Sequence, residues 1–328
     1  MTQALQENVT LQINLAPSDW RVAQHVLPHQ VSAWRGQVSE ILLTVDLHRS
    51  SGRFAANWEE GRDRIMAIAH SVPGARVAEI DYGAESQRRV SAEFFGGAKV
   101  PAKDFRGGPY YAYFYGLNAA RNNLVLHTDS DIFFGGRSPT WMSEAVRRMR
   151  SDPSILVMAP NPGPPAEDGR LRQLKSSPND ARHVHRMDNM STRVFLLDRI
   201  RFRERIGRLH PSPPSALRSR IKAKVEGNPV ADLPEHLFTE QMKSCGLYRV
   251  DFLGDGPGMW TLHPPYRCAD FFEKLPLLVK RVEAGDIPEG QRGDHDINES
   301  LVDWSEAKAT LARNRWWRRL ANRFGIRV

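Results

Sequence analysis

The chain has 328 residues, of which 41% are apolar and 26% charged, an ordinary composition for a globular protein. This length holds one large domain or two modest ones. No run approaches the roughly 18 consecutive apolar residues of a membrane span. The first ten residues lack the basic region and apolar block of a signal peptide, so we expect a cytoplasmic protein.

The charge balance indicates acidic partners. The net charge is +8 and the pI is near 9.7, which suits nucleotide phosphates, anionic lipid headgroups or nucleic acid. Charge alone does not choose among these three classes. Cys245 and Cys268 lack the spacing of metal ligands, and in a reducing compartment we expect both to be free thiols.

Strand and helix patterns alternate over the first 81 residues. This order is the βαβ pattern of a parallel sheet, on which ligands bind at the carboxyl ends of the strands. Asp46 and Asp81 each close one of the expected strands. Pro28 should kink or split the first helix. We expect strands over 8–15, 40–46 and 75–81, and helices over 20–34 and 58–69.

The stretch 122–136 carries the main functional motif. A short apolar run, 124–126, is followed by Asp129, Ser130 and Asp131. Two carboxylates at the end of a buried strand cannot both ionise cheaply unless a cation or several donors lie between them. Magnesium or manganese is often held by one or two carboxylates, with substrate phosphates filling other positions. We therefore predict a metal–diphosphate site; the alternative is an Asp-Ser-Asp turn that caps the next helix.

A second candidate phosphate contact precedes this motif. Arg106 stands before two glycines and Pro109, which suits the first turn of a helix. A helix N-terminus with flexible glycines and an arginine can contact phosphate, although the glycines can equally form a simple turn. Beyond the motif we expect a helix over 141–149, a strand over 154–159 and a loop over 161–180.

The second half of the chain is less regular. We expect a strand over 191–197, with Asp188 just before it, a helix over 234–245 and a short strand over 248–253. His263 stands beside two prolines in a rigid segment. No internal repeat is visible, and we place substrate specificity in the irregular segments.

From residue 8 to about 270 the chain resembles GT-A fold glycosyltransferases, closest to the family 2 type. The resemblance rests on a Gly-Leu-Asn-Ala-Ala-Arg helix, 116–121, followed by the strand and Asp-Ser-Asp motif, 124–131. It implies an α/β fold: a Rossmann-like, mostly parallel sheet flanked by helices, with a C-terminal helical tail. It also implies transfer of a sugar from a nucleoside-diphosphate sugar to a saccharide or lipid-linked acceptor, with Mn²⁺ or Mg²⁺ as cofactor.

The resemblance also implies residue roles on the donor side. Asp131 would be the principal metal ligand, and Asp129 would face the metal or the nucleotide ribose, with Ser130 between them on the nucleotide sugar. Asp46 would contact the nucleobase. The matches for further donor-side contacts are Asp81 and Arg106, and for the metal or diphosphate His263.

For the catalytic base the resemblance points to an acidic pair on the helix before Gly246. Glu235 and Glu240 fall in that region, but Glu235-His236 stands where the family carries Glu-Asp, so both stay candidates, with Asp188 as a third. A base of this kind implies an inverting reaction. The Q-x-x-R-W signature of processive members is absent, which argues against a polymer synthase.

We divide the chain into a catalytic domain, 1–275, and a C-terminal extension, 276–328. Within the catalytic domain, 8–160 would bind the donor and 161–275 the acceptor. In the tail, 311–328, tryptophans and most of the arginines fall on opposite faces of a helix. This pattern suits a peripheral helix on an anionic membrane surface; the alternative is a helix packed on the catalytic domain.

Three other readings stay open. A retaining glycosyltransferase can use the same motif. A sugar nucleotidyltransferase should show a Gly-rich basic loop after the first strand, where this chain has Ala-Pro-Ser-Asp-Trp at 16–20. A basic membrane- or nucleic-acid-binding protein would leave the strand-end aspartates unexplained, because they repel a phosphate backbone. We do not expect nucleic acid to bind.

Overall fold

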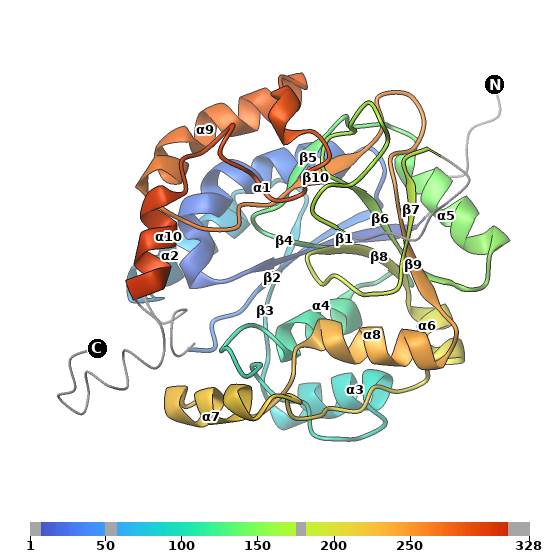
Figure 1. The fold of residues 1–328 in the computed structure, drawn as a ribbon. Coiled ribbons are helices and arrows are strands. Elements are labelled where there is room, and N and C mark those ends of the chain that lie inside the picture. The colour runs from blue at the N-terminus through green and yellow to red at the C-terminus, as the bar shows by residue number, and fades with distance from the viewer. Residues whose placement is uncertain (1–7, 50–57, 175–181, 314–328) are drawn as a thin grey trace.

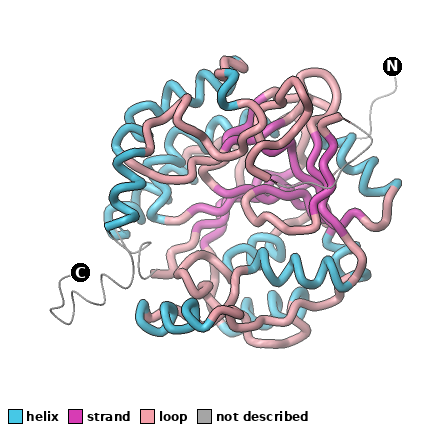
Figure 2. The backbone as a smooth tube through the Cα atoms, viewed as in Figure 1, coloured by secondary structure: helices cyan, strands magenta, loops and turns pink. Residues whose placement is uncertain are grey.

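The computed structural model describes residues 8–49, 58–174 and 182–313. These residues form a ten-stranded sheet with helices on both of its faces (Figures 1 and 2). The strands are β1 Val9–Leu15, β2 Glu40–Val45, β3 Arg76–Glu79, β4 Leu124–Asp129, β5 Phe133–Gly135, β6 Ile155–Pro162, β7 Val184–Met187, β8 Val194–Asp198, β9 Tyr248–Phe252 and β10 Trp260–Leu262.

The main path of the sheet runs β3-β2-β1-β4-β8-β6-β10-β5, and β9 pairs with β6 and β7. β1 pairs in parallel with β2 and with β4, and β2 pairs in parallel with β3. β8 lies antiparallel between β4 and β6. Only β5, β7 and β8 run against the other strands of the described chain. The predicted α/β fold with a mostly parallel sheet is confirmed.

Two layers of helices cover the sheet. The core on one face is built with α1, α2 and α5, and the core on the other face with α3, α4, α6 and α8. The helices are α1 Trp20–Trp34, α2 Trp58–His70, α3 Ala84–Phe94, α4 Tyr111–Ala119, α5 Trp141–Ser151, α6 Arg199–Arg205, α7 Leu217–Glu226, α8 Pro234–Ser244, α9 Ala269–Ala284 and α10 Ser305–Arg313, with short 3-10 turns η1 Pro17–Asp19 and η3 Glu289–Gln291.

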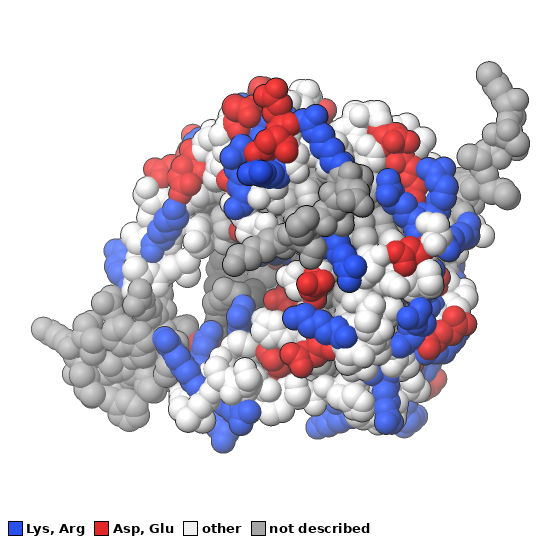
Figure 3. Space-filling view, turned by 45° about the vertical axis from the view of Figure 1, so that its right-hand side comes forward, with Lys and Arg blue, Asp and Glu red and all other residues white. Residues whose placement is uncertain are grey.

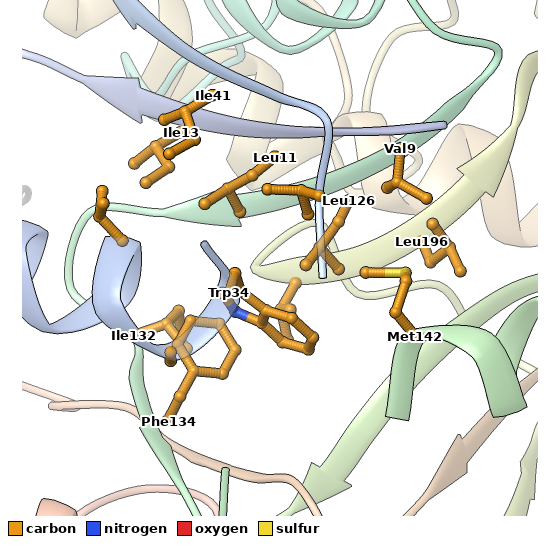
Figure 4. Packing of buried hydrophobic residues seen from close by; sticks show 14 of the residues in the cluster. Val9, Leu11, Ile13, Trp34, Ile41, Leu126, Ile132, Phe134, Met142 and Leu196 are labelled. Atoms are coloured by element: carbon orange, nitrogen blue, oxygen red, sulfur yellow. The ribbon is translucent and has the colours of Figure 1, made fainter. Parts of the chain in front are cut away.

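Apolar side chains alternate with polar ones along β1, and the apolar ones form part of the core beneath α1. Val9, Leu11 and Ile13 are fully buried on the face that α1 covers. Trp34 at the end of α1 packs edge-on against Phe134, with ring centroids 5.2 Å apart (Figure 4). The intervening residues of β1 point to the other face of the sheet, where a series of hydrogen-bonded polar side chains begins.

Two expectations about the elements are corrected. Pro28 does not split the first helix, which runs from Trp20 to Trp34 with its buried face packed against both the sheet and α9. β3 ends at Glu79, so Asp81 lies beyond the strand rather than at its last position.

The described residues after 275 pack against the rest of the chain. α9 spans Ala269–Ala284 and so crosses the expected boundary at 275 and 276. Beyond it, Ile297, Val302 and Trp304 share one buried cluster with Leu262 of β10. α9 lies beside α1 (Figure 1). The described part of the expected extension therefore shares a hydrophobic core with the expected catalytic domain.

None of the helices in the described ranges has the length and apolar character needed to cross a bilayer. The predicted interfacial helix, 311–328, lies outside the described residues from 314 onward.

Candidate active site

The Asp-Ser-Asp motif forms a tight turn at the carboxyl end of β4. The backbone N–H of Asp129 donates to the carbonyl of Arg193, 2.8 Å away. Gln30 of α1 donates its side-chain amide to the carbonyls of Asp129 and Ile132, each at 2.8 Å. The chain then enters β5 at Phe133, and α5 begins only at Trp141. The motif therefore does not cap a helix, and the alternative explanation is wrong.

Asp131 lies in an ion pair at this turn. Arg267 donates from Nη2 to Oδ2 of Asp131 at 3.0 Å and from Nη1 to Oδ1 of Asp19 at 2.9 Å. Burial opposes ionisation of Asp131, but the charges of His263 and Arg267 outweigh it and hold the pKa of the carboxyl below its usual range. Asp131 is therefore a carboxylate at neutral pH.

Asp129 has the opposite electrostatic surroundings. Burial raises the pKa of its carboxyl, and nearby His127 offsets this only in part. The hydroxyl of Tyr113 donates to Oδ1 at 3.3 Å, and Nε2 of His127 lies 3.5 Å from the same oxygen. Because its environment disfavours the charged form, Asp129 would gain from a bound cation.

A buried polar chain fixes the orientation of His127. Thr44 donates its hydroxyl to Oδ1 of Asn14 at 2.6 Å, and Gln12 donates its amide to Thr44 at 2.7 Å. The amide oxygen of Gln12 therefore accepts from Nδ1 of His127, leaving Nε2 toward Asp129. His127 is therefore a hydrogen-bonding residue at the end of β4.

His263 is held beside the turn by a carboxylate that the sequence did not reveal. Its Nδ1 lies 2.8 Å from Oδ1 of Asp296, and Nη1 of Arg193 donates to that same oxygen at 3.2 Å. A carboxylate only accepts hydrogen bonds, so Nδ1 of His263 carries the proton and its Nε2 holds a free lone pair when the ring is neutral. The imidazole is thereby prepared to bind a cation through Nε2.

Asp46 stands directly after β2 beside an open pocket. Its Oδ2 accepts from Nζ of Lys103 at 2.5 Å and its Oδ1 from the hydroxyl of Tyr82 at 3.1 Å. The ring of Tyr82 lies 4.6 Å from that of His48. The pocket has a volume of about 470 Å³, and it is lined by Leu47, His48, Glu79, Ile80, Asp81 and Tyr82.

Asp81 and Arg106, which we expected to contact the sugar donor, are both exposed to solvent. The carboxylate of Asp81 accepts from the N–H of Gly83 at 2.7 Å and from Oγ of Ser86 at 2.6 Å, so it organises the start of α3. Arg106 donates its backbone N–H to Oδ1 of Asp104 at 2.7 Å, and its side chain is exposed. Asp81 still borders the pocket.

The three candidate bases differ in position. Glu235 is half-buried in the first turn of α8. Burial and the charge of Asp129 are the main causes that raise the pKa of Tyr113, and the charge of Glu235 adds to them. The charges of Glu235 and Asp129 therefore both act on Tyr113. Glu240 and Asp188 are exposed, the first further along α8 and the second just after β7. Ser130 is buried within the turn.

Protein side chains alone do not enclose a metal here. Among the described residues, no three His, Cys, Asp or Glu side chains are grouped closely enough to hold an ion. Magnesium and manganese commonly complete their shell with substrate phosphates and water, and need only one or two carboxylates from the protein. The oxygens of Asp129 and Asp131 and the Nε2 of His263 are donors of the right chemistry for such an ion.

The structure thus defines an α/β protein with a carboxylate site at the carboxyl edge of its sheet. No family model and no curated protein matches the chain. Among solved structures, it is similar to glucosyl-3-phosphoglycerate synthase from Mycobacterium tuberculosis in complex with Mn²⁺, UDP and phosphoglyceric acid, with 13% identity, a TM-score of 0.38, and coverage of 84% of this chain and 76% of that one.

A second similar structure is the galactosyltransferase LgtC in complex with donor and acceptor sugar analogues. It shows 11% identity and a TM-score of 0.38, with coverage of 87% of this chain and 99% of that one. Likenesses this low carry no part of the functional assignment, which comes from the residues of this chain.

Proposed function

We propose that this chain is a metal-dependent glycosyltransferase that moves a sugar from a nucleoside-diphosphate sugar to an acceptor hydroxyl. The observation that carries the proposal is the Asp129–Asp131 turn at the carboxyl edge of the sheet. There Asp131 is ionised and paired with Arg267, burial raises the pKa of the Asp129 carboxyl, and His263 is close enough to act on both carboxyls. Such a place suits a divalent cation bound together with two phosphates.

In this proposal the carboxylates of Asp129 and Asp131 and Nε2 of His263 are the candidate ligands of a Mn²⁺ or Mg²⁺ ion, and the diphosphate and water would fill its other positions. Because the three side chains do not enclose an ion by themselves, the diphosphate would complete the site. Such an ion, when bound, would supply positive charge against the charge that builds on the departing diphosphate. Arg267 supports the same role, because its guanidinium already lies at Asp131 and can contact phosphate oxygens with more than one N–H. The Asp296 carboxylate keeps His263 in the tautomer whose Nε2 is free.

The nucleoside would occupy the pocket after β2 and β3. Its wall carries the rings of His48 and Tyr82, which can pack against a nucleobase. Asp46, directly before the pocket residues, is fixed by Lys103 and Tyr82 and can accept from a base or ribose donor. The pocket and the Asp-Ser-Asp turn lie at the same edge of the sheet, as one bound nucleotide sugar requires.

Glu235 is our choice for the base. It would take the proton from the acceptor hydroxyl as that oxygen bonds to the anomeric carbon. The bond from that carbon to the diphosphate breaks at the same time, and the configuration inverts. Glu235 is half-buried near Tyr113, whereas Glu240 and Asp188 are exposed. A saccharide or lipid-linked acceptor of the cell envelope or a polysaccharide pathway would enter from the 161–275 half.

Cleavage of the donor tests this function. The full chain, incubated with nucleotide sugars, Mn²⁺ and a mixture of acceptors, should release one nucleoside diphosphate, and the anomeric configuration of the product, read by NMR, should be inverted. Absence of metal-dependent release from any donor by the folded protein would remove the proposal. A retained configuration would remove only the role given to Glu235.

Glu235→Gln should lower the transfer rate by about 10²- to 10⁴-fold, the usual contribution of a general base. The matched control is Glu240→Gln on the same helix, which should stay close to the wild-type rate because that side chain is exposed. Donor binding should survive in both variants. Loss of transfer in the Glu240 variant alone would show that the base is assigned to the wrong glutamate.

A further inference from the structure

Helix α7, Leu217–Glu226, shows apolar side chains to solvent. Leu217 is 69% exposed and Ile221 45% exposed, and they stand one helical turn apart. On the opposite side of the helix, Ala223 is fully buried against Phe105 and Leu233. An ordinary surface helix turns its apolar stripe inward. In α7, Leu217 and Ile221 form a second apolar stripe that faces solvent.

Basic residues border this outer stripe. Arg218 lies on one side of it and Lys224 on the other, at 100° per residue, and both are exposed. The only acidic residue of α7 is Glu226, which lies 3.7 Å from Lys222. Along the lower edge of the molecule, where α7 lies in Figure 1, Figure 3 shows more Lys and Arg than Asp and Glu.

Hydrogen bonds link the end of α7 to the segment that carries Lys103, the partner of Asp46. Asn228, just after the helix, donates its side-chain amide to the carbonyl of Phe105 at 3.4 Å, and the N–H of Phe105 donates to the carbonyl of Ala231 at 2.8 Å. Two residues earlier, Lys103 pairs with Asp46. A surface bound to α7 would therefore lie next to the catalytic edge of the sheet.

We propose that α7 docks the protein on an anionic lipid bilayer, with Leu217 and Ile221 entering the headgroup region and Arg218 and Lys224 contacting lipid phosphates. An exposed aliphatic stripe between basic side chains is the pattern of an interfacial helix. A second copy of the chain is a poorer occupant, because pairing two such helices would bring their basic borders together. This docking stands apart from the proposed transferase activity, although it would bring a lipid-linked acceptor to the site.

Flotation with lipid vesicles tests the docking. The full chain should bind vesicles containing phosphatidylglycerol at low salt and dissociate from them at high salt. It should not bind vesicles of pure phosphatidylcholine. The double variant Leu217→Asn with Ile221→Asn should bind at least about tenfold more weakly, because it loses the apolar insertion. Its control is Leu277→Asn on α9, where the leucine is 58% exposed.

Lys224→Glu should weaken the same binding, while Arg147→Glu on α5, an exposed arginine elsewhere, should change it much less. Donor cleavage in solution and thermal stability should stay unchanged in every variant. The proposal is overturned if the wild type ignores anionic vesicles or if the double variant binds them as the wild type does. It is equally overturned if the double variant alters only the oligomeric state measured by light scattering, which would make α7 a contact between copies.

Discussion

Asp131→Asn should lower the rate of sugar transfer by at least about 10³-fold, because it removes the carboxylate that we propose as the main ligand of the cation. Asp131 is the carboxyl that its surroundings keep ionised, through the charges of His263 and Arg267. An amide in its place is a weak ligand for a hard divalent ion. The transfer rate at saturating donor and Mn²⁺ is the measurement.

The matched control for this variant is Asp198→Asn. Asp198 ends β8 of the same sheet, but its carboxylate caps α6 by accepting from the N–H of Ile200 at 2.9 Å. Asparagine caps helices about as well as aspartate, so activity and melting temperature should both hold. Metal-dependent transfer by a folded Asp131→Asn protein at the wild-type rate would contradict the metal assignment.

Asp296→Asn should weaken the affinity for Mn²⁺, measured by calorimetry in the presence of the bound nucleoside diphosphate, by about 10- to 100-fold. Asp296 accepts a hydrogen bond from Nδ1–H of His263, which keeps the proton on Nδ1 and leaves Nε2 free. An asparagine can donate to Nδ1 instead, which would move the ring proton to Nε2 and block it as a ligand. The nucleoside itself should still bind, because its pocket is untouched.

Arg193→Gln separates this effect from a general disturbance of the loop. It removes the guanidinium that lies 3.2 Å from Oδ1 of Asp296 but leaves the bond between Asp296 and His263 in place. Mn²⁺ affinity should therefore stay within a few fold of the wild type. Equal Mn²⁺ affinity in Asp296→Asn and the wild type would show that His263 does not act through Nε2.

The half of the site built from parallel strands could be predicted from the sequence. Apolar runs that end in aspartate identify β2 and β4, and parallel pairing brings Asp46 and the Asp129–Asp131 turn to one edge. Asp81 shows where that reasoning fails. β3 ends at Glu79, and the Asp81 carboxylate beyond it accepts a hydrogen bond from Ser86 at the start of α3.

No local sequence pattern predicted the residues that complete the site. Arg267, Arg193 and Asp296 come from separate segments of the second half, and only the packed tertiary structure places them around Asp131 and His263. The parallel bridge between His263 and Asp296 lies outside the named strands, so no periodicity predicts it. The same packing joins the segment after residue 275 to the site, although we expected a separate extension from residue 276.

The most direct test of the central claim is a calorimetric titration of the full chain with UDP, GDP, CDP, dTDP and ADP, each with and without Mn²⁺. We predict that one of these diphosphates binds only, or much more tightly, when Mn²⁺ is present, and this result would also limit the donor to the sugars of that nucleotide. Folded protein that binds none of the five, with or without the metal, would contradict the assignment of the Asp129–Asp131 turn as a metal–diphosphate site.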